Sequence, residues 1–231
     1  MNTRGSTEGA HTTGRGRPAR LSRDRICDAA LSMLTKDPAQ SIGLRELGEY
    51  LGVDPTAIYR HFSDKDDLLR EVGDRALAPA IRGLVPTEDP LADLTQLCLA
   101  LRKTLLRNPV ALNLTSIGPT RHENELRITE VMLDALLRAG LDEHAAVVAY
   151  HVLIEYTLGS ALLDAPLAAQ GSGRARTYRQ WRADYSALDS DEYPASVRVA
   201  RQLYPPSDQV FLIGLRTLIT GLTTATWSDL Y

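Results

Sequence analysis

The stretch that decides the fold is IGLRELGEYLGVDPTAIYRHFSDKDDLLREV, residues 42–72 of a chain of 231 residues. Its apolar periodicity predicts two short helices, over residues 43–51 and 55–62, with a break at Gly52. Asp54 suits the N-cap of the second helix, and Pro55 suits its first turn. Two short helices joined through a glycine turn match helix-turn-helix geometry, in which the second helix enters the major groove of DNA. An ordinary helical hairpin in an all-α core has the same spacing, so both interpretations stay open.

Apolar side chains in this stretch are placed to lock the two helices together. They are Leu47, Leu51, Val53 and Ile58. The second helix then keeps short or polar groups on its remaining faces: Thr56, Ala57, Tyr59, Arg60 and His61. A major groove about 12 Å wide accepts a helix of this kind.

The helical pattern continues on both sides of this stretch. Apolar residues between Ile26 and Leu34 predict a helix with Ser22 as its N-cap. Ser63, with Asp66 three residues later, is typical of a variant capping box that opens a helix from residue 64 to about residue 84. Further helices are predicted over residues 90–107, 120–139, 142–163 and 207–227, with a polar stretch over residues 165–206. No alternating strand pattern of useful length appears. We therefore predict an all-α fold, with an N-terminal three-helix helix-turn-helix domain and a larger helical domain.

Residues 145–163 are apolar enough to require a membrane test, because 19 residues could cross a bilayer about 30 Å thick. The segment contains His151 and Glu155, however, and a carboxylate at the bilayer centre costs at least about 2.5 kcal/mol. We therefore expect a helix that is buried on most sides within a soluble protein.

The composition excludes several classes of protein. Hydrophobic residues make up 44% of the chain and charged residues 24%, which excludes disorder, collagen-like repeats and disulfide-stapled mini-proteins. Cys27 and Cys98 make neither a metal cluster nor a disulfide framework, and the N-terminus lacks the apolar run of a signal peptide, so we expect a cytoplasmic protein. The motifs of common hydrolases, zinc proteases and phosphate-binding loops are missing. We expect no catalysis, no cofactor and no metal.

The charge is divided unevenly along the chain. The net charge is −3, but residues 1–25 carry +4 and the other 206 residues carry −7. Residues 1–20 are poor in large apolar side chains and are predicted to form a flexible basic arm. Within it, Arg15-Gly16-Arg17-Pro18 resembles an AT-hook core, whose two arginines enter a narrow minor groove. A solvated charged tail is the alternative interpretation.

The stretch at residues 42–72 also resembles the DNA-binding region of the TetR family of bacterial transcriptional regulators. The resemblance rests on the run Tyr59-Arg60-His61-Phe62, followed by Ser63, Lys65 and a leucine pair, and it extends over residues 21–77. A weaker resemblance lies at residues 207–222, SDQVFLIGLRTLITGL, which look like the last helix of several ligand-binding domains in this family. The resemblance implies a helix-turn-helix domain over residues 21–76 and an effector-binding and dimerisation domain over residues 77–231.

The resemblance also implies which residues meet DNA bases. Arg45 matches a position at the start of the first short helix that contacts DNA. Pro55, Thr56 and Ala57 match the opening of the recognition helix, whose side chains face base edges. Arg60 matches a position that varies with the operator sequence, and either a guanine or a phosphate would be its partner.

Three further residues match positions that hold the DNA backbone. Tyr59 and His61 resemble phosphate-binding residues of the recognition helix. Lys65 resembles a phosphate clamp at the N-terminus of the next helix, where the helix dipole adds to its charge.

In this resemblance the two late helices, residues 142–163 and 207–227, pair with their copies in a four-helix dimer interface. Gly159, Ala161, Gly214 and Gly221 would permit the close approach of these helices. A two-fold dimer matches pseudo-palindromic DNA, and a small-molecule effector would shift the two reading heads and release the operator.

The residues that would bind this effector are predicted from the helical pattern. His151 and Glu155 share one face of an apolar helix and demand polar partners, either on a ligand or within the protein. Tyr178 and Trp181 belong to an aromatic stripe that would either cover a pocket or pack internally. Asn113 is a further candidate.

The sequence thus predicts a homodimeric repressor of the TetR type that is released by a small, largely apolar effector. Two other hypotheses stay open: an architectural DNA-binding protein that needs no effector, and a helical dimer that only binds other proteins.

Overall fold

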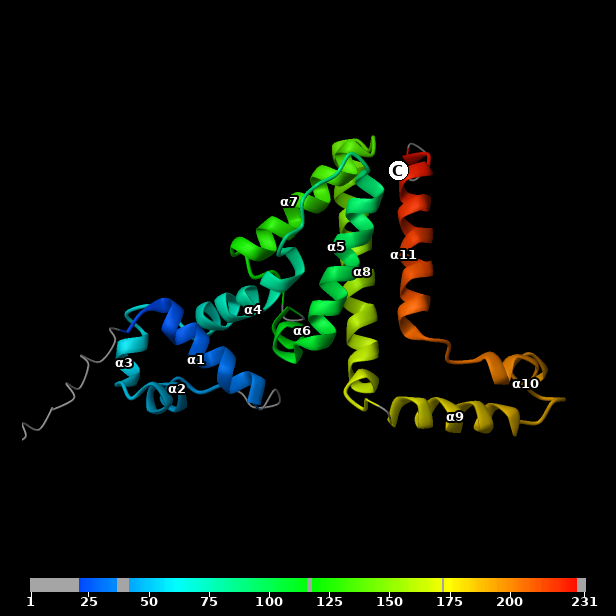
Figure 1. Ribbon diagram of the computed structural model, residues 1–231, viewed down its shortest axis with the longest axis horizontal. Coiled ribbons are helices and arrows are strands. Elements are labelled where there is room, and N and C mark those ends of the chain that lie inside the picture. The colour runs from blue at the N-terminus through cyan, green and yellow to red at the C-terminus, as the bar shows by residue number, and fades with distance from the viewer. Residues whose placement is uncertain (1–20, 37–41, 116–117, 172, 228–231) are drawn as a thin grey trace, which may run out of the picture.

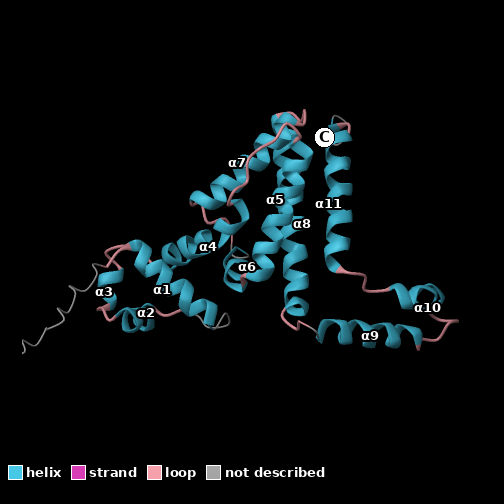
Figure 2. Cartoon of the chain, viewed as in Figure 1, coloured by secondary structure: helices cyan, strands magenta, loops and turns pink. Residues whose placement is uncertain are grey.

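The computed structural model describes residues 21–36, 42–115, 118–171 and 173–227, and within these ranges it contains helices and loops but no strand (Figure 2). The all-α prediction is therefore confirmed. The helices are α1 (Arg23–Lys36), α2 (Leu44–Leu51), α3 (Pro55–Ile58), α4 (Lys65–Ile81), α5 (Pro90–Arg107), α6 (Pro109–Thr115), α7 (Glu123–Arg138), α8 (Glu143–Ala168), α9 (Gly173–Ser186), α10 (Pro194–Val199) and α11 (Ser207–Thr224), with a 3₁₀ turn at Ala200–Gln202.

The helix ends in the N-terminal part follow from local hydrogen bonds. The Arg25 amide donates to Ser22 Oγ at 3.2 Å, and the Thr56 amide donates to Asp54 Oδ1 at 2.8 Å, so both predicted N-caps are confirmed. Gly52 lies in the left-handed region with φ of 68°, which allows the tight turn between α2 and α3.

Two predicted boundaries in this part are wrong. The second short helix ends at Ile58 instead of residue 62, and the His61 and Phe62 amides both bond to the Ile58 carbonyl in a turn that follows it. The N-cap of α4 is Asp64 instead of Ser63: the Asp67 amide donates to Asp64 Oδ1 at 2.7 Å, and the Ser63 amide donates to Asp67 Oδ2 at 3.0 Å. The cap is therefore formed one residue later than expected, and the returning bond to Asp67 comes from Ser63, the residue before the N-cap, instead of from the N-cap itself.

The described residues bury two hydrophobic cores, and α4 contributes to both. Its first half supplies Leu68 and Val72 to a core built with α1, α2 and α3. Its second half supplies Ala76, Leu77 and Ala80 to the larger core of α5, α7, α8 and α11. The predicted domain boundary between residues 76 and 77 thus lies within one continuous helix (Figure 1).

The apolar segment that required the membrane test is α8. Among the described helices it could, by length and composition alone, span a bilayer. In its most apolar stretch of 18 residues, 28% of the residues are buried. A single stripe from Ala145 to Asp164 faces the core, while Val147, Leu162 and Leu163 are exposed. The expectation of a helix buried on most sides is therefore wrong for the single chain. The helix also runs five residues past the predicted end at residue 163.

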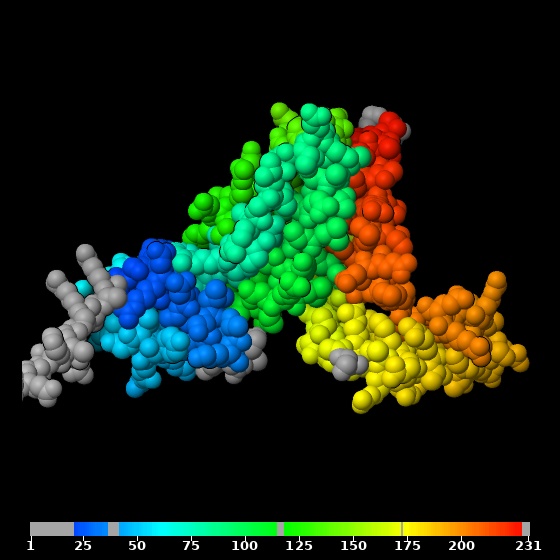
Figure 3. All heavy atoms as spheres, in the orientation of Figure 1, coloured from blue at the N-terminus to red at the C-terminus, as the bar shows by residue number. Residues whose placement is uncertain are grey.

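The polar stretch at residues 165–206 contains two helices, α9 and α10, which project from the body as a hairpin (Figures 1 and 3). Neither helix has a buried residue. The hairpin is held together by an aromatic cluster, in which the rings of Tyr178, Trp181 and Tyr185 lie 5.5, 4.8 and 6.1 Å from the Tyr204 ring. Arg182 adds hydrogen bonds to the carbonyls of Leu203 and Tyr204.

Candidate DNA interface and effector cavity

The predicted recognition helix α3 is anchored on one side and open on the other. Ile58 and, on α2, Leu47 are fully buried, which fixes the angle between the two helices. Thr56, Tyr59 and Arg60 are exposed, and the Tyr59 side chain remains 56% accessible to solvent. An exposed aromatic residue beside an arginine on a short, anchored helix can meet phosphates and base edges.

The remaining predicted DNA contacts lie around this helix. Pro55, Ala57 and His61 are half-buried in α3 and the turn after it, and Lys65 is half-buried at the first position of α4. Arg45 projects from α2 with its side chain 87% exposed, and its Nε lies 3.4 Å from Glu49 Oε1. An exposed pair of this kind contributes little stability, so phosphate can replace Glu49 at low cost. Arg15 and Arg17 lie outside the described residues.

Asp54 brings a carboxylate to the start of α3. Its Oδ1 accepts hydrogen bonds from both the hydroxyl (2.6 Å) and the amide (2.8 Å) of Thr56. These two hydrogen bonds hold the pKa of Asp54 below its usual value. The bond from the Thr56 hydroxyl also holds that group against the Asp54 side chain.

A network that the sequence did not predict joins α1 to α4 and to the turn after α3. Arg23 donates to Glu71 at 2.6 and 3.0 Å, donates to the His61 carbonyl, and stacks 4.1 Å from the Phe62 ring. Arg75 binds the other Glu71 oxygen at 2.7 Å. Burial disfavours the Glu71 carboxylate, but the bonds from Arg23 and Arg75 outweigh it and lower the pKa of Glu71. No local motif links Arg23 to Glu71, which lies 48 residues later.

A cavity of about 430 Å³ lies in the larger domain, lined by residues of α4, α5, α7 and α8 and of the segment before α7. This volume is within the range of small-molecule sites. The predicted pair His151 and Glu155 lines it, and both side chains are exposed. Leu77 of α4 forms part of the wall. Among the described residues, the lining consists of Leu77, Leu101, Gly118, Pro119, Thr120, Glu125, Ile128, Thr129, Tyr150, His151, Ile154, Glu155 and Leu158.

Polar groups of this cavity are tied to α4 by Asp74. This carboxylate is 3% exposed and accepts hydrogen bonds from the Thr120 hydroxyl, from the amide and side chain of Asn124 and from the Glu125 amide, at 2.8 to 3.1 Å. It therefore caps the first turn of α7 from a neighbouring helix. Thr120 and Glu125 also line the cavity, so Asp74 connects the cavity wall to the helix that reaches α3.

The other predicted effector residues lie elsewhere. Asn113 is exposed on α6 and is not among the residues that line the cavity. Tyr178 lines a separate groove of about 610 Å³ between α8, α9 and α11. Trp181 packs on Tyr178 and Tyr204 in the hairpin. The structure thus brings together only His151 and Glu155 of the five candidates, and Glu155 lies between the cavity and the groove.

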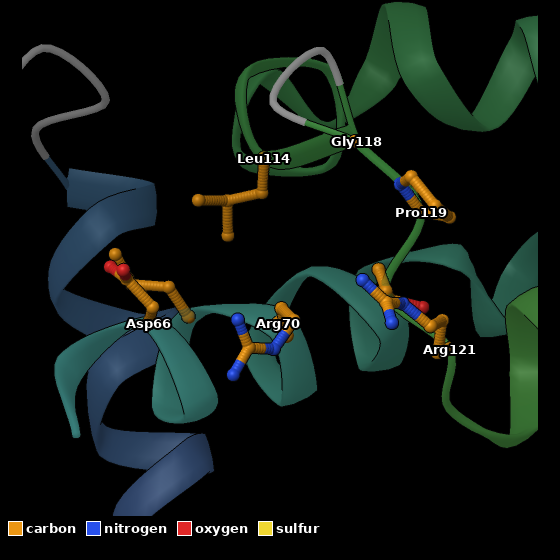
Figure 4. A pocket seen from close by; sticks show the side chains of 8 residues that line it. Asp66, Arg70, Leu114, Gly118, Pro119 and Arg121 are labelled. Atoms are coloured by element: carbon orange, nitrogen blue, oxygen red, sulfur yellow. The ribbon is translucent and has the colours of Figure 1, made fainter.

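A smaller pocket of about 240 Å³ lies where the two domains meet (Figure 4). Arg70 of α4 and Arg121 of the segment before α7 line it, together with Leu114 of α6. It shares Gly118, Pro119 and Thr120 with the larger cavity, so the two hollows have a common wall.

The described residues contain no group of three or more histidine, cysteine or acidic residues that could hold a metal ion. Cys27 and Cys98 are free thiols buried in different cores. Burial raises the pKa of each thiol to about 12, so neither is a nucleophile at neutral pH.

Comparisons with known proteins agree with this architecture. Residues 26–72 match the family model "Bacterial regulatory proteins, tetR family", and residues 85–226 match "Tetracyclin repressor-like, C-terminal domain". An HTH-type transcriptional regulator of Saccharopolyspora erythraea is 31% identical over 185 residues, which cover 76% of each chain. The tetracycline repressor protein class D of Escherichia coli is 27% identical and covers 88% of this chain and 89% of its own.

A solved structure, ActR of Streptomyces coelicolor in complex with actinorhodin, has the same fold with a TM-score of 0.78 and 22% identity, covering 88% of this chain and 97% of its own. The two family models together extend over most of the chain, and the stretch between them, residues 73–84, contains the second half of α4. The chain therefore belongs to the TetR family of bacterial transcriptional regulators.

Proposed function

We propose that this regulator is a cytoplasmic homodimeric repressor that binds pseudo-palindromic operator DNA and is released when a small molecule fills the 430 Å³ cavity. The observation that carries this proposal is the position of α4. Its first half, through Leu68 and Val72, packs in the same core as Ile58 of the recognition helix, and Leu77 in the same helix lines the cavity. One helix therefore contacts both sites.

The proposed DNA contacts follow the exposed side of α3. Tyr59, His61 and Lys65 hold phosphates, while Arg60 reads a base edge and the opening residues of α3 lie against the groove. Arg45 binds a phosphate from α2. Arg15 and Arg17 of the basic arm enter the neighbouring minor groove.

The proposed dimer buries the apolar surface that α8 and α11 leave open. Leu163 is 83% exposed, Ile213 59% and Val210 49%, and α8 and α11 pack side by side within the chain. Exposed apolar patches of this kind mark interfaces. A two-fold axis through this face would present two α3 helices to half-sites about 34–36 Å apart.

Effector release requires that the ligand bind one arrangement of the domains more tightly than the other. A 100-fold preference corresponds to about 2.7 kcal/mol. Asp74 supports a route for this coupling, because it joins the wall of the cavity to α4. The relatives named as repressors, and the ActR complex with actinorhodin, support the same interpretation.

The test begins by selecting genomic DNA fragments on the full chain and measuring their mobility shifts. Tyr59→Ala and Lys65→Ala should weaken binding to every selected fragment, because both remove backbone contacts. Lys103→Ala, which removes an equal charge from the exposed side of α5, should not. Failure to select any specific fragment, or equal binding by the Lys65 and Lys103 variants, would exclude this docking.

A second measurement separates the repressor from an architectural protein that needs no effector. Thermal denaturation of the full chain against a metabolite library should find a compound that stabilises it saturably and also releases the selected fragment. Saturable binding without release would favour the architectural alternative.

A further inference from the structure

The cavity of the larger domain combines an apolar lining with two carboxylates. Its apolar part is formed by Leu77, Leu101, Ile128, Ile154 and Leu158. Glu125 comes from α7 and Glu155 from α8, two helices that pack against each other, so the two residues line the cavity from different walls. No lysine or arginine is among the described residues that line it.

Neither carboxylate is neutralised by a cation within the described part of the chain, since the ion pairs there involve other acidic residues. Glu125 is held in place by neutral donors: the Arg121 amide at 3.1 Å and the Thr129 hydroxyl at 3.0 Å. Thr129 in turn lies 3.1 Å from the Tyr150 hydroxyl. These bonds orient the carboxylate but leave its negative charge available to a ligand.

We infer that the effector of this regulator is an apolar or aromatic molecule that carries a positive charge, such as an amine or a quaternary onium group. The inference rests on the proposed function, because it takes this cavity as the effector site. A cation placed between Glu125 and Glu155 gains Coulomb attraction from both, and the attraction is stronger beside the half-buried Glu125 than in water. An anion of the same shape would be repelled by the same two groups.

The net charge of the molecule offers a second source of cation preference, because the residues after the basic arm carry −7. That general field would act on every cation and would be changed equally by any removed carboxylate. The two sources therefore differ in how they respond to substitution at one position.

The probe pair is tetraphenylphosphonium and tetraphenylborate, two ions of closely matched size and apolar surface with opposite charge. Isothermal titration of the full chain should show at least about tenfold tighter binding of the phosphonium ion. Equal affinities, preference for the borate ion, or binding of neither ion would overturn the inference.

Glu155→Gln keeps the shape of the side chain and removes its charge, and should weaken phosphonium binding about fivefold or more. Glu125→Gln should do the same, with thermal denaturation showing that each variant is folded. The matched control is Glu130→Gln, which removes an exposed carboxylate from α7 outside the cavity. If Glu130→Gln weakens phosphonium binding by the same factor, the preference comes from the general field of the molecule, and the inferred cation site is wrong.

Mobility shifts of the selected operator fragment distinguish this inference from the proposed function. If the chain binds its operator specifically but shows no charge preference in the titration, the proposed regulatory function stands and the inferred ligand class is wrong. If the proposed function and the inferred ligand class are both correct, tetraphenylphosphonium should release the operator. This release should be reduced in Glu155→Gln and unchanged in Glu130→Gln.

Discussion

Asp74 is satisfied entirely by neutral donors, with four hydrogen bonds to its two oxygens. Asp74→Asn would turn an NH₂ group toward backbone amides that are themselves donors. Leaving buried donors without an acceptor costs about 1–3 kcal/mol. We expect the free energy of unfolding to fall by this amount in thermal or urea denaturation. Glu130→Gln, at an exposed position in the interior of α7, should leave it unchanged, and an equal loss there would contradict this account of Asp74.

Arg60 allows a test of base reading at a single side chain. If it forms a bidentate contact with guanine, Arg60→Ala should lose about 1–3 kcal/mol of discrimination at one base pair of each half-site. Mobility shifts against operators altered at one position at a time would measure this loss. Weakening that is equal for all operators would assign Arg60 to a phosphate instead.

Residues whose partners are close in sequence could be predicted, and those with distant partners could not. Ser22 and Asp54 cap helices through amides two or three residues away, so residue type and position suffice. Arg23 binds Glu71 across two helices, and nothing in its surroundings in the sequence indicates this. Helical spacing alone places His151 and Glu155 on one face. Glu125 is brought to the same cavity only by the packing of α7 against α8, which the sequence does not indicate.

At the scale of elements, the packing of α8 against α11 depends on one glycine. A Cβ at Gly214 would lie 2.8 Å from the Tyr156 ring carbon Cζ, and that ring is stacked 5.2 Å from Phe211. Gly214→Ala should therefore displace the ring and lower the melting temperature. A melting temperature equal to that of the unchanged chain would contradict this account.

The same comparison corrects the set of small residues predicted to line a dimer interface. Gly214 makes room for Tyr156 of its own chain, and Ala161 is fully buried in its own core. Gly159 and Gly221 have open space beside them and remain candidates for contact with a second copy. Sequence spacing cannot separate these two groups, because a small residue permits close approach to whichever helix is its neighbour.

At the scale of the molecule, the exposed apolar face of α8 and α11 should decide the oligomeric state. Leu163→Glu places a charge at the most exposed of its leucines and should give a monomer with weak operator binding. Leu126→Glu on α7, where the leucine is 55% exposed, should remain dimeric. Analytical ultracentrifugation measures both. A dimeric Leu163 variant would place the interface elsewhere.

Acid should destabilise the whole chain through carboxylates that are charged in the folded state. Burial disfavours the Asp93 carboxylate, but hydrogen bonds from Arg138 and Thr87 outweigh it and lower the pKa of Asp93, as those from Arg23 and Arg75 do for Glu71. A group with a lowered folded pKa stabilises above its unfolded pKa of about 4, and this contribution is lost as the pH falls further. Urea unfolding between pH 6 and pH 3 should show this decline. Asp93→Asn should flatten it, and an unchanged slope would contradict the assignment.

Because α4 is shared by both cores, it also acts as a rigid arm of fixed length. Its 17 residues extend about 25 Å at 1.5 Å per residue. A tilt of about 5° at its cavity end would move its other end by about 2 Å, more than a hydrogen bond to a base edge can tolerate. Under the proposed mechanism, a ligand that shifts the cavity wall by only a fraction of an ångström would disturb the contacts at the operator.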